Sequence, residues 1–143
     1  MNTQVSHIVL ADKEQVTARL TAAGVYPTSQ RVAIAQVLLA EHQHVTADKL
    51  QEMLYLSGRK ISKATVYNSL KRFVEKGLVN ELVIDNQRAF YDTNTSHHHH
   101  VYNLDTGELF DIDCFNLSLL QSVELPQGTE IDSVDLVLRV RNT

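Results

Sequence analysis

Apolar residues recur at helical spacing in four successive segments of the first half of the chain. Each segment follows a residue that caps helix N-termini well, and these caps are Asp12, Thr28, Thr46 and Ser62. Gly24 and Gly77 follow the first and the last segment, where glycine commonly ends a helix. The pattern therefore predicts four helices between residues 12 and 77.

The spacing changes after Gly77. Residues 78–84 and 88–92 read as strands joined by a polar turn, so that helices followed by a β-hairpin predict a winged helix-turn-helix domain over 1–92. A second hairpin is predicted over 98–113, a short amphipathic helix over 115–123 and an alternating strand over 133–140. We expect an α+β protein in which a small α/β domain, residues 93–143, buries too little surface to be stable alone and forms a homodimer.

Four consecutive histidines, His97–His100, lie between two strand-like segments. Because successive side chains of a strand point to opposite faces, we expect His98 and His100 on one face and His97 and His99 on the other. Imidazole is the commonest protein ligand of transition metals. The run predicts a metal or haem site, and a solvated polar loop is the alternative.

Composition narrows the class of protein. An apolar content of 43% and a charged content of 21% are typical of a globular protein. The chain has no apolar run long enough to span a bilayer and does not start with a signal-peptide pattern, so we expect a cytoplasmic protein without a membrane partner. The single cysteine, Cys114, excludes an intrachain disulfide and a cysteine-rich zinc site, and we expect it in the core.

Charge is distributed unevenly along the chain. Residues 1–92 carry a net charge of +2 and residues 93–143 carry −6, and within residues 59–76 six basic residues face the single acid Glu75. Apolar positions 66, 70, 73 and 74 form the inward stripe of the last predicted helix. Polar, basic and aromatic side chains on its outer face favour contacts with phosphates and base edges over an ordinary solvated surface. We expect DNA recognition by Lys63, Thr65, Tyr67, Asn68, Lys71 and Arg72.

The chain resembles the ferric uptake regulator (Fur) superfamily over nearly its whole length. The match is carried by Thr28-x-x-Arg31, Ile61-Ser62-x-x-Thr65-Val66-Tyr67, Leu70, Gly77-Leu78, Tyr91-Asp92-Thr93-Asn94-Thr95 and the histidine run. The resemblance implies a homodimeric, metal-dependent transcription factor that binds double-stranded operator DNA through its N-terminal domain. It adds Arg31 to the expected DNA-binding residues.

The resemblance also implies a regulatory metal site between the two domains. The family pattern is a histidine after the second helix, an acid after the wing, two histidines at i, i+2 and a downstream acid. Here His44, Asp92, His98, His100 and Asp111 meet it, with the spacing of the peroxide-sensing branch. This nitrogen and oxygen set suits Fe(II), Mn(II) or Zn(II). An ion held by both domains would fix the angle between the recognition helices of the dimer.

Two departures from the family pattern change the expected cofactors. Asn103 and Thr106 stand at the turn where many members have Cys-x-x-Cys, so we expect no structural zinc held by four cysteines. The segment around the histidines resembles most the iron response regulator (Irr) branch, which senses iron through haem, although the Cys-Pro motif of that branch is missing. The resemblance therefore implies an iron- or haem-responsive regulator, with His97–His100 as the haem or second site, and a peroxide-sensing repressor as the alternative.

Two other classes of protein fit less well. A metalloenzyme needs an open coordination position and a positioned general base, and no base stands at convincing motif spacing, so we expect no enzyme. A haem or metal carrier would use the histidines, but that function does not explain the basic stripe, the six basic residues within 59–76 near Tyr67. Both remain remote alternatives to the regulator.

Overall fold

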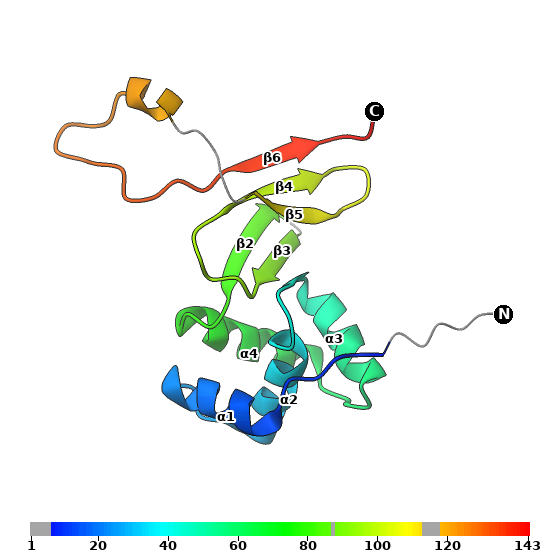
Figure 1. Ribbon diagram of the computed structural model, residues 1–143. Coiled ribbons are helices and arrows are strands. Elements are labelled where there is room, and N and C mark those ends of the chain that lie inside the picture. Colours follow the sequence, from blue (N-terminus) through cyan, green and yellow to red (C-terminus); the bar gives the residue numbers. More distant parts are fainter. Residues whose placement is uncertain (1–6, 87, 113–117) are drawn as a thin grey trace. The chain divides into compact units, whose positions relative to one another are not determined.

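The protein is described by a computed structural model that covers residues 7–86, 88–112 and 118–143. It divides into two compact units, Met1–Thr95 and Ser96–Thr143 (Figure 1), which are described one at a time. The first unit combines helices with a small sheet, and the regular secondary structure described in the second is mainly strand. The predicted α+β class is confirmed.

The helices of the first unit begin where the sequence predicts. They are α1 (Lys13–Ala22), α2 (Ser29–Leu38), α3 (Ala47–Leu56) and α4 (Lys63–Glu75). The side chain at each predicted cap accepts a hydrogen bond from the backbone N–H three residues later, at 3.0 to 3.2 Å. These bonds satisfy N–H groups that have no partner within the helix.

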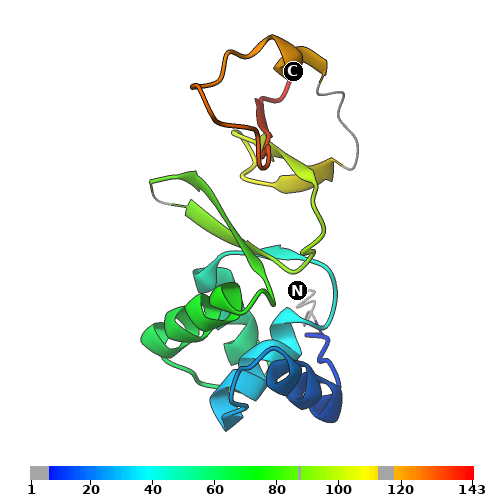
Figure 2. The same cartoon turned by 90° about the vertical axis from the view of Figure 1, so that its left-hand side faces the viewer.

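The end of α4 sets the start of the β-hairpin. Gly77 has φ +73°, a left-handed conformation that costs glycine little, and the N–H of Leu78 bonds back to the carbonyl of Phe73 at 2.9 Å. The chain then forms β2 (Asn80–Asp85) and β3 (Arg88–Asp92), which project from the helices as a hairpin (Figure 2). The predicted wing is confirmed, with β2 starting two residues later than expected.

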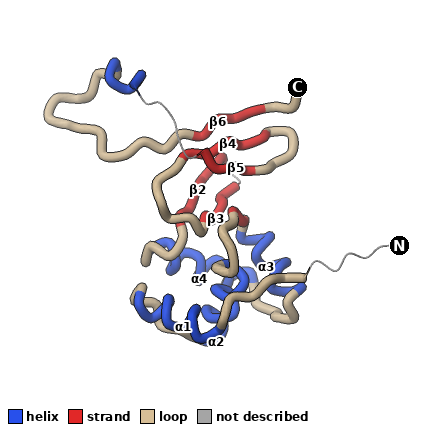
Figure 3. The backbone as a smooth tube through the Cα atoms, in the orientation of Figure 1, coloured by secondary structure: helices blue, strands red, loops and turns tan. Residues whose placement is uncertain are grey.

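A third strand joins this hairpin. The two-residue strand β1 (His44–Val45), between α2 and α3, pairs antiparallel with β3 and gives the order β1-β3-β2. Figure 3 shows β2 and β3 as neighbouring strands. Its register places His44 opposite Asp92. The sequence did not predict this strand, because two residues between helices carry no alternation.

The core of the first unit lies between the helices. Leu20, Ile34, Leu50, Leu70 and Phe73 are fully buried in it. Each helix contributes side chains spaced three or four positions apart, as the apolar pattern requires. This packing fixes α4 with the opposite face toward solvent, which decides what that helix can contact.

Truncation of the core at α4 is expected to destabilise the first unit. Leu70→Ala removes a fully buried side chain, so we expect the free energy of unfolding to fall by about 2–5 kcal/mol in urea denaturation followed by circular dichroism. Leu56→Ala makes the same chemical change at a site 57% exposed on α3 and should cost no more than about 0.5 kcal/mol. Equal losses in the two variants would contradict the assignment of Leu70 to the core.

The second unit is organised around one central strand. In its sheet β4 (His99–Asn103) lies between β5 (Leu109–Ile112), to which it is antiparallel, and β6 (Val137–Val140), to which it is parallel. A 3-10 helix (Ser118–Ser122) precedes β6. The predicted second hairpin is therefore confirmed.

Two predictions for the second unit need correction. The described part of the expected helix over 115–123 is the short 3-10 helix, and its first residues, like Cys114, lie outside the described residues. The expected strand over 133–140 shortens to Val137–Val140. The carbonyl of Val134 and the N–H of Leu136 bond to imidazoles, at 2.9 and 3.2 Å, and the carbonyl of Leu136 accepts a hydrogen bond from the backbone N–H of His100 at 3.0 Å. None of the described helices is long and apolar enough to cross a bilayer.

Candidate metal centre and nucleic-acid interface

The first set of candidate ligands lies on two neighbouring strands of the first unit. Because β1 pairs with β3 in the register His44 to Asp92, the two side chains meet across the ladder, and Nε2 of His44 lies 3.3 Å from Oδ2 of Asp92. The other oxygen, Oδ1, accepts a hydrogen bond from the N–H of Asn94 at 2.9 Å. The carboxylate is buried and oriented, with Oδ2 directed toward the imidazole.

The short strand β1 is held in place by hydrogen bonds from beyond its ends. The backbone N–H of Gln43 donates to Oγ1 of Thr93 at 3.0 Å, and the N–H of Thr93 donates to the carbonyl of Gln43 at 3.2 Å. The Gln43 amide donates in turn to the carbonyls of Val37 and Leu38 at the end of α2. The position of His44 is therefore fixed by Gln43 and Thr93, neither of which the sequence analysis names as a site residue.

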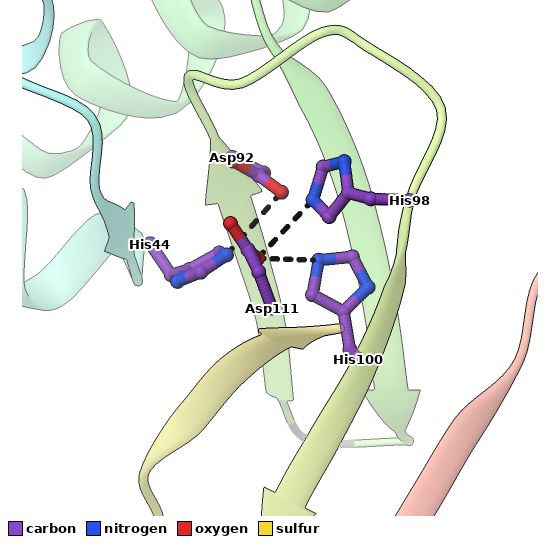
Figure 4. A group of neighbouring side chains, drawn as sticks. All are labelled: His44, Asp92, His98, His100 and Asp111. Atoms are coloured by element: carbon purple, nitrogen blue, oxygen red, sulfur yellow. Dashed lines mark ion pairs between the residues drawn. The ribbon is translucent and has the colours of Figure 1, made fainter. Parts of the chain in front are cut away.

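The second set of candidate ligands belongs to the second unit, where His100 lies on β4, Asp111 on β5 and His98 just before β4. His100 faces Asp111 in the antiparallel register, and His98 precedes His100 by two positions on the same side. Nε2 of His98 and Nε2 of His100 lie 3.2 and 3.4 Å from the same carboxylate atom, Oδ1 of Asp111 (Figure 4). The two imidazole rings are 4.5 Å apart between centroids. The alternation predicted for this pair is confirmed.

One hydrogen bond fixes the orientation of His98. Its Nδ1 lies 2.6 Å from the carbonyl oxygen of Ser96. Because a carbonyl only accepts, Nδ1 carries the proton in the neutral ring, and the lone pair of Nε2 faces Asp111. A metal-ligating histidine usually donates its outer ring N–H to a backbone carbonyl or a carboxylate in this way, and the other ring nitrogen then faces the ion.

The donor atoms of each set have the spacing of metal ligands. Ligand atoms about 2.1 Å from a common ion are roughly 3.0 to 3.4 Å apart in octahedral or tetrahedral geometry, and the contacts above measure 3.2 to 3.4 Å. His44 and Asp92 offer two donors in the first unit, and His98, His100 and Asp111 offer three in the second. Imidazole and carboxylate donors fit Fe(II), Mn(II) or Zn(II).

The other two histidines of the run bond to the protein backbone. Nε2 of His97 lies 2.9 Å from the carbonyl oxygen of Val134, and Nδ1 of His99 accepts a hydrogen bond from the N–H of Leu136 at 3.2 Å. Their rings meet edge to face, with centroids 5.2 Å apart. The predicted second face of the run thus holds the segment that leads into β6.

The predicted DNA-binding residues fall into two groups. Tyr67, Asn68 and Lys71 lie exposed on α4, and Tyr67 is 43% exposed. The other four contact groups within the protein. Two form ion pairs, Lys63 with Asp48 and Arg72 with Glu75. Thr65 accepts a hydrogen bond from the Ser62 hydroxyl, and Arg31 donates one to the carbonyl of Tyr26. Arg31 belongs to α2, so it lies apart from the α4 face in sequence and in element.

Comparison with known proteins supports one family. The model of the Ferric uptake regulator family matches residues 22–139. The Peroxide-responsive repressor PerR of Staphylococcus epidermidis is 37% identical over 111 residues, which cover 78% of this chain and 72% of that protein.

Solved structures agree with the sequence comparison. The ferric uptake regulator of Pseudomonas aeruginosa with manganese is 30% identical, with a TM-score of 0.68 over 89% of this chain and 97% of that one. The Francisella tularensis regulator with iron is 25% identical, with a TM-score of 0.71 over 83% of this chain and 92% of that one. The chain belongs to the ferric uptake regulator family.

Proposed function

We propose that this protein is a metal-dependent, DNA-binding transcriptional repressor of the peroxide-responsive type. The observation that carries the proposal is the paired ligand sets, three imidazoles and two carboxylates with metal-ligand spacing. The identity of 37% to a protein named as a peroxide-responsive repressor supports that type over the iron response regulator branch. In this role the protein acts in the cytoplasm, where the DNA is.

We further propose that one ion binds both ligand sets. Neither set alone fills the coordination of Fe(II), Mn(II) or Zn(II), which take four to six donors. Asp92 and His98 are six residues apart, so their Cα atoms are never more than about 22 Å from one another. A bound divalent ion supplies a cross-link that neither set makes alone. His44 and Asp92 would then hold the first unit, and with it α4, in one orientation.

The proposed DNA contact is the exposed face of α4. Its helix axis is fixed by the buried residues Val66, Leu70 and Phe73, so Tyr67 and Lys71 project from a rigid support. A phenol and an ammonium one turn apart supply a base-edge or sugar contact and a phosphate contact. Asn68 adds an amide that can pair with an adenine edge.

We propose that the second unit forms the homodimer. It has about 50 residues, too few to bury a stable core alone. Phe110 is 51% exposed on β5, and Leu138 and Val140 are 39% and 38% exposed on β6. Apolar side chains on both outer strands of a three-stranded sheet are typical of an interface with a second copy.

Haem is not part of the proposal. Nε2 of His97 and Nδ1 of His99 are already bonded to backbone groups, and the relatives described above are named for peroxide, manganese and iron. The hypothesis of an iron response regulator that senses haem therefore gains no support from His97 and His99. The experiment below nevertheless includes haem, because a haem response would restore that reading.

The proposal is tested by a DNA-binding titration. A duplex is selected from a random-sequence pool with Mn(II)-loaded protein, and its affinity is measured by fluorescence anisotropy for metal-free, Mn(II)-, Fe(II)- and haem-loaded protein at fixed salt. We expect two chains per duplex by sedimentation and tighter binding with Mn(II) or Fe(II) than without metal. Selection of no sequence, or equal affinity in every state, would overturn the proposal.

Peroxide sensing gives a separate chemical prediction. With Fe(II) bound and hydrogen peroxide added, an imidazole ring carbon of His44 or His98 should gain one oxygen atom. Two electrons pass from the ring to the peroxide and one molecule of water leaves, so the mass rises by one oxygen. Fragment spectra should place the oxygen on His44 or His98 and not on exposed His42. Mn(II)-loaded protein is the control, and absence of the shift with Fe(II) would refute the peroxide-responsive type.

A further inference from the structure

An ion pair joins α3 to α4 at the exposed face. Nζ of Lys63 lies 3.2 Å from Oδ1 of Asp48, and both side chains are largely exposed, at 61% and 71%. The same ammonium lies over the ring of Tyr67, 5.9 Å from its centroid. Lys63 and Tyr67 are four positions apart on α4, so they share one face of that helix.

Stability does not explain this arrangement. Exposed ion pairs contribute little to folding, because water already solvates both charges and the side chains lose freedom. The hydrogen bond from Lys63 to Asp48 and the nearby negative charge raise the pKa of the Lys63 ammonium, so the cation stays fully charged while it is held. What the pair does determine is the position of one cation on the proposed DNA-binding face.

The Asp48 carboxylate is unexpected beside a DNA-binding face, because it repels phosphates. Glu52, one turn farther along α3, offers a useful comparison: it pairs with Lys49 of its own helix at 3.3 Å, and that pair involves no residue of α4. Asp48 differs because its partner lies on the recognition helix and against an aromatic ring. The two carboxylates therefore carry equal charge but only one of them controls a side chain of α4.

We propose that Asp48 is a positioning residue for DNA specificity, which holds Lys63 against Tyr67 and away from the phosphates. The inference rests on the proposed function, because it presupposes that α4 binds DNA. Held in this way, Lys63 adds little to sequence-independent binding, and the Tyr67 ring keeps a defined orientation toward the groove. Asp48 thus lowers the sequence-independent affinity of the protein for DNA and raises its discrimination between DNA sequences.

The experiment compares Asp48→Asn with Glu52→Gln in the full-length, Mn(II)-loaded protein. The probes are the duplex selected above and a shuffled duplex of equal length, each titrated over a range of salt concentrations. In Asp48→Asn, release of Lys63 to a phosphate should steepen the slope of log affinity against log salt by about 0.9. The preference for the selected duplex should fall about two- to fivefold, the factor that an exposed cation–π contact is worth.

Controls separate positioning from net charge. Glu52→Gln removes the same charge from α3. We expect its salt slope and its preference for the selected duplex to equal those of the unmodified protein within error. In a Lys63→Met background, Asp48→Asn should do no more than Glu52→Gln does. Equal effects of the two carboxylate variants, or persistence of the Asp48→Asn effect without Lys63, would overturn the inference. If instead Tyr67→Ala leaves DNA affinity unchanged, it is the proposed function that fails.

Discussion

His98→Ala or His100→Ala is expected to abolish metal-dependent DNA binding. Each change removes one of two imidazoles whose Nε2 atoms face the same oxygen of Asp111. Loss of an outer partner of a ligand typically costs 10- to 100-fold in metal affinity, so loss of a ligand itself should cost more than about 100-fold. Mn(II) affinity, measured by competition with a chelator, should fall by that factor, and DNA affinity in the presence of Mn(II) should fall to the metal-free value.

His42→Ala is the matched control for the histidine variants. It removes an exposed imidazole close to His44 in sequence, and His42 is not among the five candidate ligands. We expect Mn(II) affinity and DNA affinity to stay as in the unmodified protein. Unchanged Mn(II) affinity in His98→Ala, with His42→Ala as reference, would show that the His98 imidazole is not a ligand.

The second large effect is expected on the DNA side of the protein. Tyr67→Ala should weaken binding to the selected duplex by about 1–3 kcal/mol and reduce the preference for it, because an exposed aromatic side chain on a fixed helix is lost. Lys71→Ala should weaken binding to selected and shuffled duplexes alike and lower the salt slope by about 0.9, as removal of one phosphate contact does. Anisotropy titrations at several salt concentrations separate the two patterns.

Lys13→Ala provides the reference for these variants. It removes one exposed positive charge from α1, outside the basic stripe of residues 59–76. We expect its salt slope to match that of the unmodified protein. A slope that falls equally in Lys13→Ala and Lys71→Ala would mean that net charge, and not the α4 face, governs DNA affinity.

Local signals explain how much of the fold the sequence predicts. A cap such as Thr28 or Ser62 acts on a backbone group three residues away, so its effect can be read from neighbouring letters. Gly77 likewise marks the end of α4 through its own conformation. The helices and the hairpins were predictable for this reason. The alternation that separates His98 and His100 from their neighbours follows from strand geometry in the same way.

Long-range partners explain what the sequence does not predict. The pairing of β1 with β3 joins residues about fifty positions apart, and nothing near His44 and Val45 indicates it. The contact of Asp48 with Lys63 depends on how α3 packs against α4. The strand over 133–140 was predicted from alternation alone, yet backbone groups of Val134 and Leu136 in its first half bond to imidazoles of another segment. The five candidate ligands could be named only from the family pattern, because they come from distant segments.

Four adjacent histidines do not by themselves determine which of them point to which face of the sheet at β4. A slip of one position would exchange His97 and His99 for His98 and His100 without changing the chemistry of either face. Tyr102 removes this ambiguity, because it shares a face with His100 and is 2% exposed. Burial of its ring favours the observed register over the slipped one by roughly 1.5–3 kcal/mol. The choice of the candidate ligand pair is thus made by a side chain outside the candidate ligand set. We therefore expect a substitution at Tyr102 to weaken the proposed metal binding while every histidine stays in the sequence.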